Sequence, residues 1–307
     1  MNNLTLRQLR YFDAVARHGH FGRAAEACAV SQPALSMQIK ELEDLLGYPV
    51  FERSARKVVL TGLGEMLAER TQAILCAVDE LESLVQASQR QPTGRVRLGV
   101  IPTVGPYFLP SVVQTLTQTY PGLDLHIRET LTLNLIADLR DGRLDIAIVA
   151  LPVSEPSLFE FPLFSETFLL ARPACESTVP VPTPQALLHK QLLLLQEGHC
   201  FREQALTFCG VQARLLSELK VLEASSLSTL VQMVGVGMGV TFLPEMSVPL
   251  EGRNPAVDIV TFNAPQPERT IGMVWRYTHP LRKQFEKLAA TIRSAPHSWQ
   301  ADKPTTL

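Results

Sequence analysis

The sequence predicts an α/β protein that begins with an N-terminal winged helix-turn-helix and continues through a long helix into a larger α/β region. Three observations support this. Residues 4–60 combine short helical patterns with a tight turn and two short strands. An apolar stripe with helical spacing then extends to about residue 91. From residue 95 onward, strand patterns alternate with helical ones, which is typical of βαβ units and a mainly parallel sheet.

The first 60 residues contain three helical segments. Apolar residues recur at helical spacing between Leu6 and Ala16, and a small-residue helix covers residues 23–28. A third helix is expected from Gln32 to about Leu46: Ser31 is a good N-cap, Pro33 suits the first turn, and Gly47 ends it. Residues 50–53 and 57–60 alternate as the two strands of a wing. Two short helices joined by a tight turn describe a helix-turn-helix.

A long helix is expected to start at Thr61-Gly62 and reach about Gln91, roughly 45 Å if unbroken. It carries an apolar stripe of Leu63, Leu67, Ile74, Val78, Leu81, Leu84 and Val85. This stripe is longer than a small domain can cover, so we expect a dimerisation helix. The alternative is packing on its own domain. A linker follows at residues 91–94.

The remaining two thirds of the chain show alternating strand and helix patterns. Expected strands cover residues 95–100, 123–127, 145–151, 168–171, 191–195, 220–222, 239–243 and 270–275. Expected helices cover residues 105–119, 132–141 and 280–294, and one more begins at Ser226. We expect a flexible tail at residues 297–307.

Composition excludes few classes of function. The net charge of −2 gives no indication of a nucleic-acid partner. Neither a signal peptide pattern nor an apolar run of 18 residues is present, so we expect a cytoplasmic protein without a membrane partner. The five cysteines Cys28, Cys76, Cys175, Cys200 and Cys209 form no CxxC pair, and in a reducing compartment they are free thiols by default. We expect no metal site and no cofactor.

Cys200 and Cys209 lie nine positions apart on an expected short helix. On such a helix their Cα atoms would be about 13 Å apart on opposite faces. A disulfide requires Cα atoms closer than about 7 Å, so a bond between these residues must unwind the helix. That would be a redox switch. The alternative is that both cysteines are inert, buried small hydrophobic residues.

Polar side chains on the third helix and the wing are candidates for contacts with DNA. Hydroxyl, amide and ammonium groups on this helix could reach base edges and phosphates in a major groove. Basic wing residues could contact the backbone or a minor groove. The alternative is that Ser31 only caps the helix and Lys40 is solvated. The candidates are Ser31, Gln32, Pro33, Ser36, Gln38, Lys40, Arg53 and Arg56.

The N-terminal pattern resembles the DNA-binding signature of LysR-type transcriptional regulators. The matching run is Arg23-Ala24-Ala25, Ser31-Gln32-Pro33-Ala34-Leu35-Ser36, Ile39, Leu42-Glu43, Leu46-Gly47, Phe51-Glu52-Arg53, Leu60-Thr61 and Gly64. One departure is Val50, where the family commonly has leucine. Asp141-Gly142-Arg143-Leu144-Asp145 and Gly235–Pro244 extend the resemblance along the chain.

The resemblance implies a winged helix-turn-helix at residues 1–60 and a linker or dimerisation helix at 61–91. It implies a regulatory domain at 94–296, built from two Rossmann-like α/β subdomains similar to periplasmic binding proteins. Subdomain I would comprise about 94–164 plus 268–296, and subdomain II about 165–267.

Within that family, the segment from Gly198 to Gly210 resembles the peroxide-sensing members. Supporting runs lie at residues 101–107, 129–132 and 269–272. The resemblance implies that Cys200 is the peroxidatic cysteine and Cys209 the resolving one. It also implies that five polar residues assist around the peroxide: Thr103, Thr132, His199, Gln204 and Arg269.

The residues themselves are consistent with this chemistry. Only a thiolate attacks peroxide, and Cys200 has His199 and Arg202 nearby in sequence at an expected helix start. Thr103 follows a strand, where it could donate a hydrogen bond to the leaving oxygen. The alternatives are that Thr103 and Thr132 only cap helices and that Arg269 is a surface ion-pair partner.

The expected function is a DNA-binding transcription activator of the oxidative-stress response that senses hydrogen peroxide through a reversible Cys200–Cys209 disulfide. Expected partners are promoter DNA, a second copy of the chain in a dimer or tetramer, RNA polymerase, and a glutaredoxin- or thioredoxin-type reductant. One alternative is a regulator with a small-molecule co-inducer in the inter-subdomain cleft. The other is a thiol peroxidase, although we expect no enzyme.

Overall fold

The computed structural model describes residues 4–53, 58–87, 91–210 and 221–295 of the 307-residue chain. The chain forms two compact units, Met1–Val85 and Gln86–Leu307. Across those described ranges, no helix is both long enough and apolar enough to cross a membrane.

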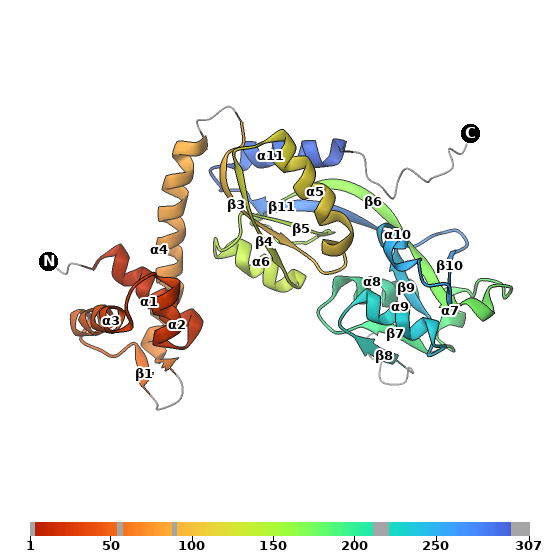
Figure 1. Cartoon of the computed structure of the whole chain (residues 1–307), viewed down its shortest axis with the longest axis horizontal. Helices are drawn as coiled ribbons and strands as arrows, with labels where there is room; N and C mark the ends of the chain where they lie inside the picture. Colours follow the sequence, from red (N-terminus) through yellow and green to blue (C-terminus); the bar gives the residue numbers. More distant parts are fainter. Residues whose placement is uncertain (1–3, 54–57, 88–90, 211–220, 296–307) are drawn as a thin grey trace. The chain divides into compact units, whose positions relative to one another are not determined.

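The first unit is a winged helix-turn-helix, as the sequence predicts (Figure 1). Ser31 caps the third helix, since its Oγ accepts a hydrogen bond from the Ala34 N–H, and Gly47 ends that helix at φ 74°. Phe12, Leu35 and other apolar side chains of these elements form one core. The elements are α1 (Leu6–His18), α2 (Phe21–Ala27), α3 (Gln32–Leu46), β1 (Phe51–Arg53), β2 (Val58–Leu60) and α4 (Gly62–Ala87).

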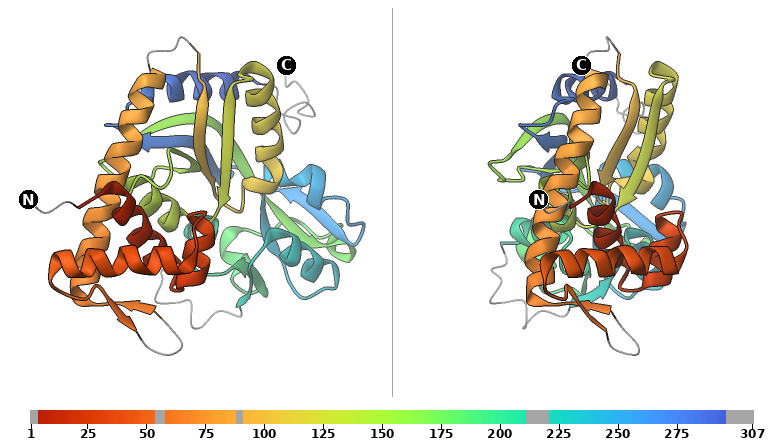
Figure 2. Two further views of the ribbon diagram at one scale, coloured as in Figure 1. Left: turned by 60° about the vertical axis from the view of Figure 1, so that its left-hand side comes forward. Right: turned by 90° about the vertical axis from the view of Figure 1, so that its left-hand side faces the viewer.

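Helix α4 follows β2 and extends away from α1–α3 as one continuous helix (Figure 2). Leu67 packs against the core of the unit. The stripe residues Leu63, Ile74 and Leu81 remain between 40% and 63% exposed. A large part of the apolar stripe is therefore uncovered within one chain.

The second unit has two lobes linked by long strands. Its first lobe contains β3 (Gly94–Val100), α5 (Gly105–Thr119), β4 (Leu123–Glu129), α6 (Thr132–Arg140), β5 (Ile146–Leu151), most of β11 (Glu268–Arg276) and α11 (Arg282–Ser294). Its second lobe contains α7 (Pro184–Leu187), β7 (Leu192–Leu195), α8 (Cys200–Phe208), β8 (Val221–Ala224), α9 (Leu227–Gly235), β9 (Thr241–Pro244), α10 (Val248–Glu251) and β10 (Val257–Thr261). Strand β6 (Leu158–Pro173) runs from one lobe into the other (Figure 1).

The large sheet is mixed, so the prediction of a mainly parallel sheet is wrong. Its strand order is β10-β6-β11-β5-β3-β4, with β9 paired to β6. Within it, β3 pairs in parallel with β4 and with β5. All the other pairs include β6 or β11 and are antiparallel. The reason is that β6 and β11 connect the lobes in opposite directions.

Helices cover both faces of the sheet in the first lobe (Figure 1). Helices α5 and α11 cover one face and α6 the other. Gly99 leaves room for α6, because a Cβ atom there would lie 2.5 Å from Leu135 Cδ2. In the second lobe, α8 and α9 share a core with the parallel pair β7–β8.

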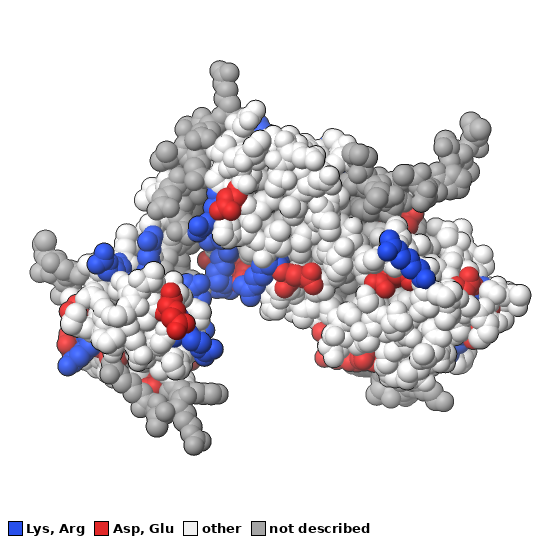
Figure 3. Space-filling model, in the orientation of Figure 1, with Lys and Arg blue, Asp and Glu red and all other residues white. Residues whose placement is uncertain are grey.

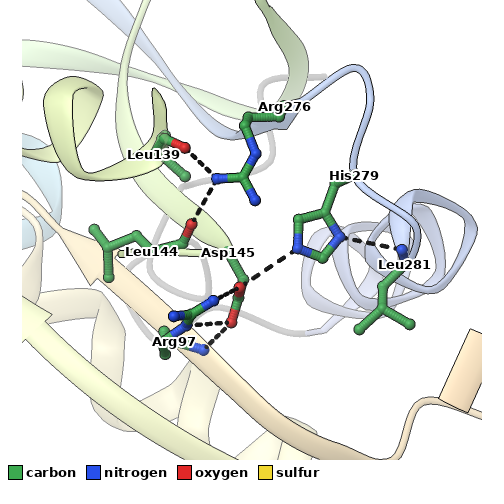
Figure 4. Close-up of polar contacts among 7 residues, drawn as sticks. All are labelled: Arg97, Leu139, Leu144, Asp145, Arg276, His279 and Leu281. Carbon is green, nitrogen blue, oxygen red and sulfur yellow. Dashed lines mark hydrogen bonds and ion pairs between the residues drawn. The ribbon is translucent and has the colours of Figure 1, made fainter. Parts of the chain in front are cut away.

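A buried polar cluster holds β3, β5 and the segment before α11 together (Figure 4). The Asp145 carboxylate accepts hydrogen bonds from the Arg97 backbone N–H and guanidinium, each at 2.7 Å, and lies 3.4 Å from His279 Nε2. Burial raises the pKa of Asp145, but the bonds from His279 and Arg97 outweigh it and lower the pKa to about 2. Arg276 donates to the Leu139 and Leu144 carbonyl oxygens beside this cluster.

Candidate functional site

A small recess lies where the loops after β3 and β4 meet the start of α8. Its volume is about 160 Å³, the space open to solvent included. The carboxyl ends of parallel strands are a common place for ligand sites in α/β proteins. The lining residues are Ile101, Pro102, Thr103, Leu131, Thr132, Gly198, His199 and Cys200.

Cys200 is the first residue of α8, as predicted, and its side chain is half-buried. Gly198 has φ +92°, a conformation that favours glycine, and a Cβ atom there would lie 2.9 Å from Leu131 Cδ1. His199 is buried at the N-cap, where its side chain makes no capping hydrogen bond. Burial lowers the pKa of His199 and so favours the neutral imidazole.

Thr103 and Arg269 are in direct contact although 166 residues separate them. The Arg269 guanidinium donates to Thr103 Oγ1 at 2.9 Å and to the Thr103 carbonyl at 3.3 Å. It also lies 2.8 Å from Glu166 Oε1 and 5.0 Å from the Phe201 ring centroid. Arg269 is fully buried, so the interpretation as a surface ion-pair partner is wrong.

Two more of the predicted residues carry buried oxygen atoms with unused hydrogen-bonding capacity. Thr132 Oγ1 and Gln204 Oε1 have no hydrogen-bond partner within the described part of the chain. Thr132 begins α6 without capping it and lines the recess, whereas Gln204 lies one turn after Cys200 on α8. Buried polar atoms left unpaired cost about 1–3 kcal/mol each, so the site favours a small hydrogen-bonding ligand.

Cys209 lies at the other end of α8, as its C-cap, and is 2% exposed. It belongs to the core of the second lobe together with Phe201, Ala205 and Leu206. Burial raises the pKa of Cys209 to about 11, so this side chain is a protonated thiol. Cys28, Cys175, Cys200 and Cys209 are free thiols. The helical rise places the two Cα atoms about 13 Å apart.

The contacts of Arg202 differ from the sequence-based expectation. Its guanidinium donates to the Leu195 carbonyl at 2.8 Å and pairs with Glu223 at 2.7 Å. Arg202 therefore joins α8 to β7 and β8, and these contacts are not with Cys200. Glu166 was missed by sequence reasoning. The signal that could have found it is a charged residue at an alternating position that is otherwise apolar, as in Phe164-Ser165-Glu166-Thr167-Phe168.

The candidate DNA-contacting residues lie along α3 and the wing. Ser31, Gln32, Pro33 and Lys40 are exposed, whereas Ser36 and Gln38 are half-buried. Gln38 donates to Glu41 at 2.7 Å. Arg53 ends β1, and Arg56 lies outside the described residues. Basic and acidic side chains are interspersed on the face of the unit that Figure 3 shows.

Comparisons with known proteins match both units. Residues 6–65 match the bacterial regulatory helix-turn-helix family of lysR type, and residues 89–296 match the LysR substrate binding domain. The chain is 40% identical over 296 residues to the Escherichia coli K12 DNA-binding transcriptional dual regulator OxyR, covering 95% of each chain. It is 41% identical to a Pectobacterium carotovorum hydrogen peroxide-inducible genes activator, covering 94% of this chain and 96% of the relative.

Two solved structures are also similar. A full-length OxyR variant from Pseudomonas aeruginosa has a TM-score of 0.75 and 38% identity, covering 95% of this chain and 96% of that one. A hydrogen-peroxide-bound OxyR variant from Corynebacterium glutamicum has a TM-score of 0.63 and 35% identity, covering 94% and 91%. The chain thus belongs to the LysR family of bacterial helix-turn-helix regulators and is one of its OxyR-like members.

Proposed function

We propose that this protein is a transcription activator of the oxidative-stress response that senses hydrogen peroxide through Cys200 and Cys209. The observation that carries the proposal is the placement of the two thiols. Cys200 lines a small recess together with Thr103, Thr132 and His199, whereas Cys209 is buried at the far end of the same helix. The name of the Pectobacterium relative, a hydrogen peroxide-inducible genes activator, and the peroxide-bound Corynebacterium structure support it.

The first step would take place in the recess. The Cys200 thiolate attacks one peroxide oxygen, the O–O bond breaks, and hydroxide leaves, giving a sulfenic acid. The leaving oxygen needs a hydrogen-bond donor, and Thr103 is suited to this role because its hydroxyl already accepts from Arg269. Thr132 and Gln204 would bind the peroxide through their unpaired oxygen atoms, and the His199 imidazole would assist beside them.

The second step would convert a local oxidation into a change of fold. The Cys209 thiol displaces water from the sulfenic acid, and a Cys200–Cys209 disulfide forms. Since the bond requires Cα atoms within about 7 Å, α8 must unwind and its buried side chains must repack. The high pKa of buried Cys209 keeps this thiol unreactive until that opening occurs.

We propose that the first unit converts this change into a change in DNA binding. The exposed apolar side chains of α4 would pair with a second copy, placing two α3 helices on the half-sites of a promoter. Ser31, Gln32, Pro33, Ser36, Gln38 and Lys40 would contact DNA from α3, and Arg53 and Arg56 from the wing. The finer proposals are a tetramer, contact with RNA polymerase, a cytoplasmic location, and reduction by a glutaredoxin- or thioredoxin-type protein.

The geometry favours the peroxide proposal over the two alternatives. Pockets for metabolites usually enclose roughly 300–1,000 Å³, whereas the recess at Cys200 holds no more than about 160 Å³ even when the space open to solvent is included. A co-inducer would therefore need a larger opening between the lobes. A thiol peroxidase would have to rebuild α8 in every turnover, whereas a sensor needs a stable oxidised state. We therefore expect stoichiometric oxidation and no enzymatic turnover.

The test is to oxidise reduced full-length protein with one equivalent of hydrogen peroxide and to map disulfides by mass spectrometry. The proposal expects a Cys200–Cys209 bond and a footprint on promoter DNA that changes on oxidation. The footprint of Cys200→Ser should stay unchanged, and Cys175→Ser, at an exposed cysteine, serves as the matched control. Absence of the bond in the wild type would refute the proposal.

A further inference from the structure

An ion pair between Glu166 and Arg269 lies buried beside the recess. Both side chains are completely inaccessible to solvent. The Arg269 Nε and one terminal nitrogen each lie 2.8 Å from Glu166 Oε1. The other carboxylate oxygen, Oε2, accepts the Met246 N–H at 2.9 Å. Glu166 does not line the recess, and the chemistry proposed above does not use it.

Strand pairing makes Glu166 the residue that sets the position of the guanidinium. Glu166 on β6 is the direct register partner of Arg269 on β11, close to the point where β6 passes between the lobes. The Met246 N–H holds the carboxylate from a third segment. A buried guanidinium without its counter-ion is strongly unfavourable, so loss of the carboxylate would make Arg269 shift toward other acceptors.

The position of Arg269 in turn decides what the Thr103 hydroxyl can do. A guanidinium only donates hydrogen bonds, so Thr103 Oγ1 must act as acceptor in the 2.9 Å contact with Arg269. The Thr103 hydroxyl proton is then left for another acceptor, and Thr103 lines the recess next to Cys200. Arg269 thereby makes Thr103 a donor toward the recess.

The same guanidinium also touches the helix that carries the thiol. It lies 5.0 Å from the ring centroid of Phe201, the residue after Cys200. A cation over an aromatic face is attracted to it, more strongly where water is excluded. One buried carboxylate therefore orients a group that contacts both the donor at the recess and the first turn of α8.

We propose that Glu166 is a positioning residue for the reaction of Cys200 with peroxide, acting through Arg269 on the Thr103 hydroxyl. The inference rests on the proposed function, because it concerns the rate of that reaction. Glu166 contacts neither the thiol nor the peroxide, and its effect requires Thr103.

The test measures single-turnover oxidation of Cys200 to sulfenic acid in full-length protein that carries Cys209→Ser, with hydrogen peroxide as the probe. Glu166→Gln keeps the size of the side chain and removes its charge. We expect the second-order rate constant to fall roughly tenfold to a hundredfold, the size of effect that a misplacement of about 1 Å can produce. The matched control is Glu160→Gln, also on β6, where the carboxylate accepts the Val153 N–H at 2.8 Å. It should react like the parent.

A double-mutant cycle separates positioning from a general structural role. In a Thr103→Val background, Glu166→Gln should slow the reaction by less than about twofold, because the donor that it orients is gone. A purely structural role would give the same factor in both backgrounds. If thermal unfolding shows that Glu166→Gln does not fold, Glu166→Asp is used in the same cycle. Aspartate keeps the charge, and its shorter side chain moves the carboxylate away from Arg269.

The outcomes distinguish this inference from the proposed function. A parent protein in which peroxide does not oxidise Cys200 would overturn the proposed function itself. If the parent reacts but Glu166→Gln reacts equally fast, only the role of Glu166 is overturned. The same holds if Glu166→Gln slows the reaction by the same factor in the Thr103→Val background as in the parent.

Discussion

Replacing Phe201 with alanine should make the Cys200–Cys209 disulfide harder to reduce. Phe201 is 3% exposed, and the centroid of its ring lies 4.7 Å from the ring centroid of Phe168. Removing such a side chain from a core costs roughly 3–5 kcal/mol. If oxidation unwinds α8 and releases the ring, this cost falls on the reduced state alone.

The size of the shift follows from that cost. For a two-electron couple, about 1.4 kcal/mol corresponds to about 30 mV. Full release of Phe201 on oxidation therefore makes the reduction potential of Phe201→Ala roughly 65–105 mV more negative than that of the wild type. Partial retention of the packing in the oxidised state gives a smaller shift of the same sign.

The assay equilibrates full-length protein in thiol–disulfide buffers and quantifies the bond by alkylation and mass spectrometry. Phe285→Ala is the matched control, because Phe285 is fully buried in the core of the other lobe. It should lower the thermal stability of both redox states and leave the potential unchanged. A potential for Phe201→Ala within about 15 mV of the wild type, or a less negative one, would refute the release of this ring.

Three further variants test other contacts. Tyr107→Phe removes the 2.8 Å hydrogen bond to Glu251 that joins α5 to α10, and urea unfolding should show a loss of about 1–3 kcal/mol. Asp145 has a pKa lowered to about 2, so its carboxylate stabilises the fold above its ordinary pKa of about 3.9, and this stabilisation fades as the pH falls toward 2. The stability difference between wild type and Asp145→Asn should accordingly narrow by about 1 kcal/mol between pH 5 and pH 3, and a constant difference would contradict this. Gly198→Ala forces φ +92° on alanine and a clash with Leu131, so unfolding experiments should show a loss of at least about 1–2 kcal/mol.

Local signals in the sequence were sufficient for most elements. Ser31 and Gly47 mark the two ends of α3, and the structure has that helix at Gln32–Leu46. The helix between the two cysteines is also confirmed, at Cys200–Phe208. Each of these predictions depends on caps and apolar spacing within a few residues, which the local sequence contains.

Strand β6 shows where local signals fail. Only residues 168–171 were predicted as a strand, whereas β6 covers Leu158–Pro173. Pro162 argues against a strand because it lacks an N–H donor. In the structure Pro162 lies opposite Gly272 at a shift in register, where the ladder is already irregular. Pairing between distant segments, which local patterns do not report, allows this proline.

The candidate site shows the same difference between what local sequence signals predict and what only the tertiary fold determines. From the residues alone, Thr103 could be either a helix cap or a donor to the peroxide, and Arg269 could be a surface ion-pair partner. The contact between them joins β11 to the loop after β3, so only the tertiary fold reveals it. Arg202 shows the converse, since its closeness to Cys200 in sequence does not predict its contacts with Leu195 and Glu223.

The central claim is that the disulfide and helix α8 exclude one another, and amide hydrogen exchange across residues 200–209 tests it most directly. Full-length protein would be compared before and after one equivalent of hydrogen peroxide, with Cys200→Ser treated identically. The account predicts that protection of Phe201–Phe208 is lost in the oxidised wild type and kept in the variant. A mapped Cys200–Cys209 bond in protein whose α8 amides remain protected would contradict it.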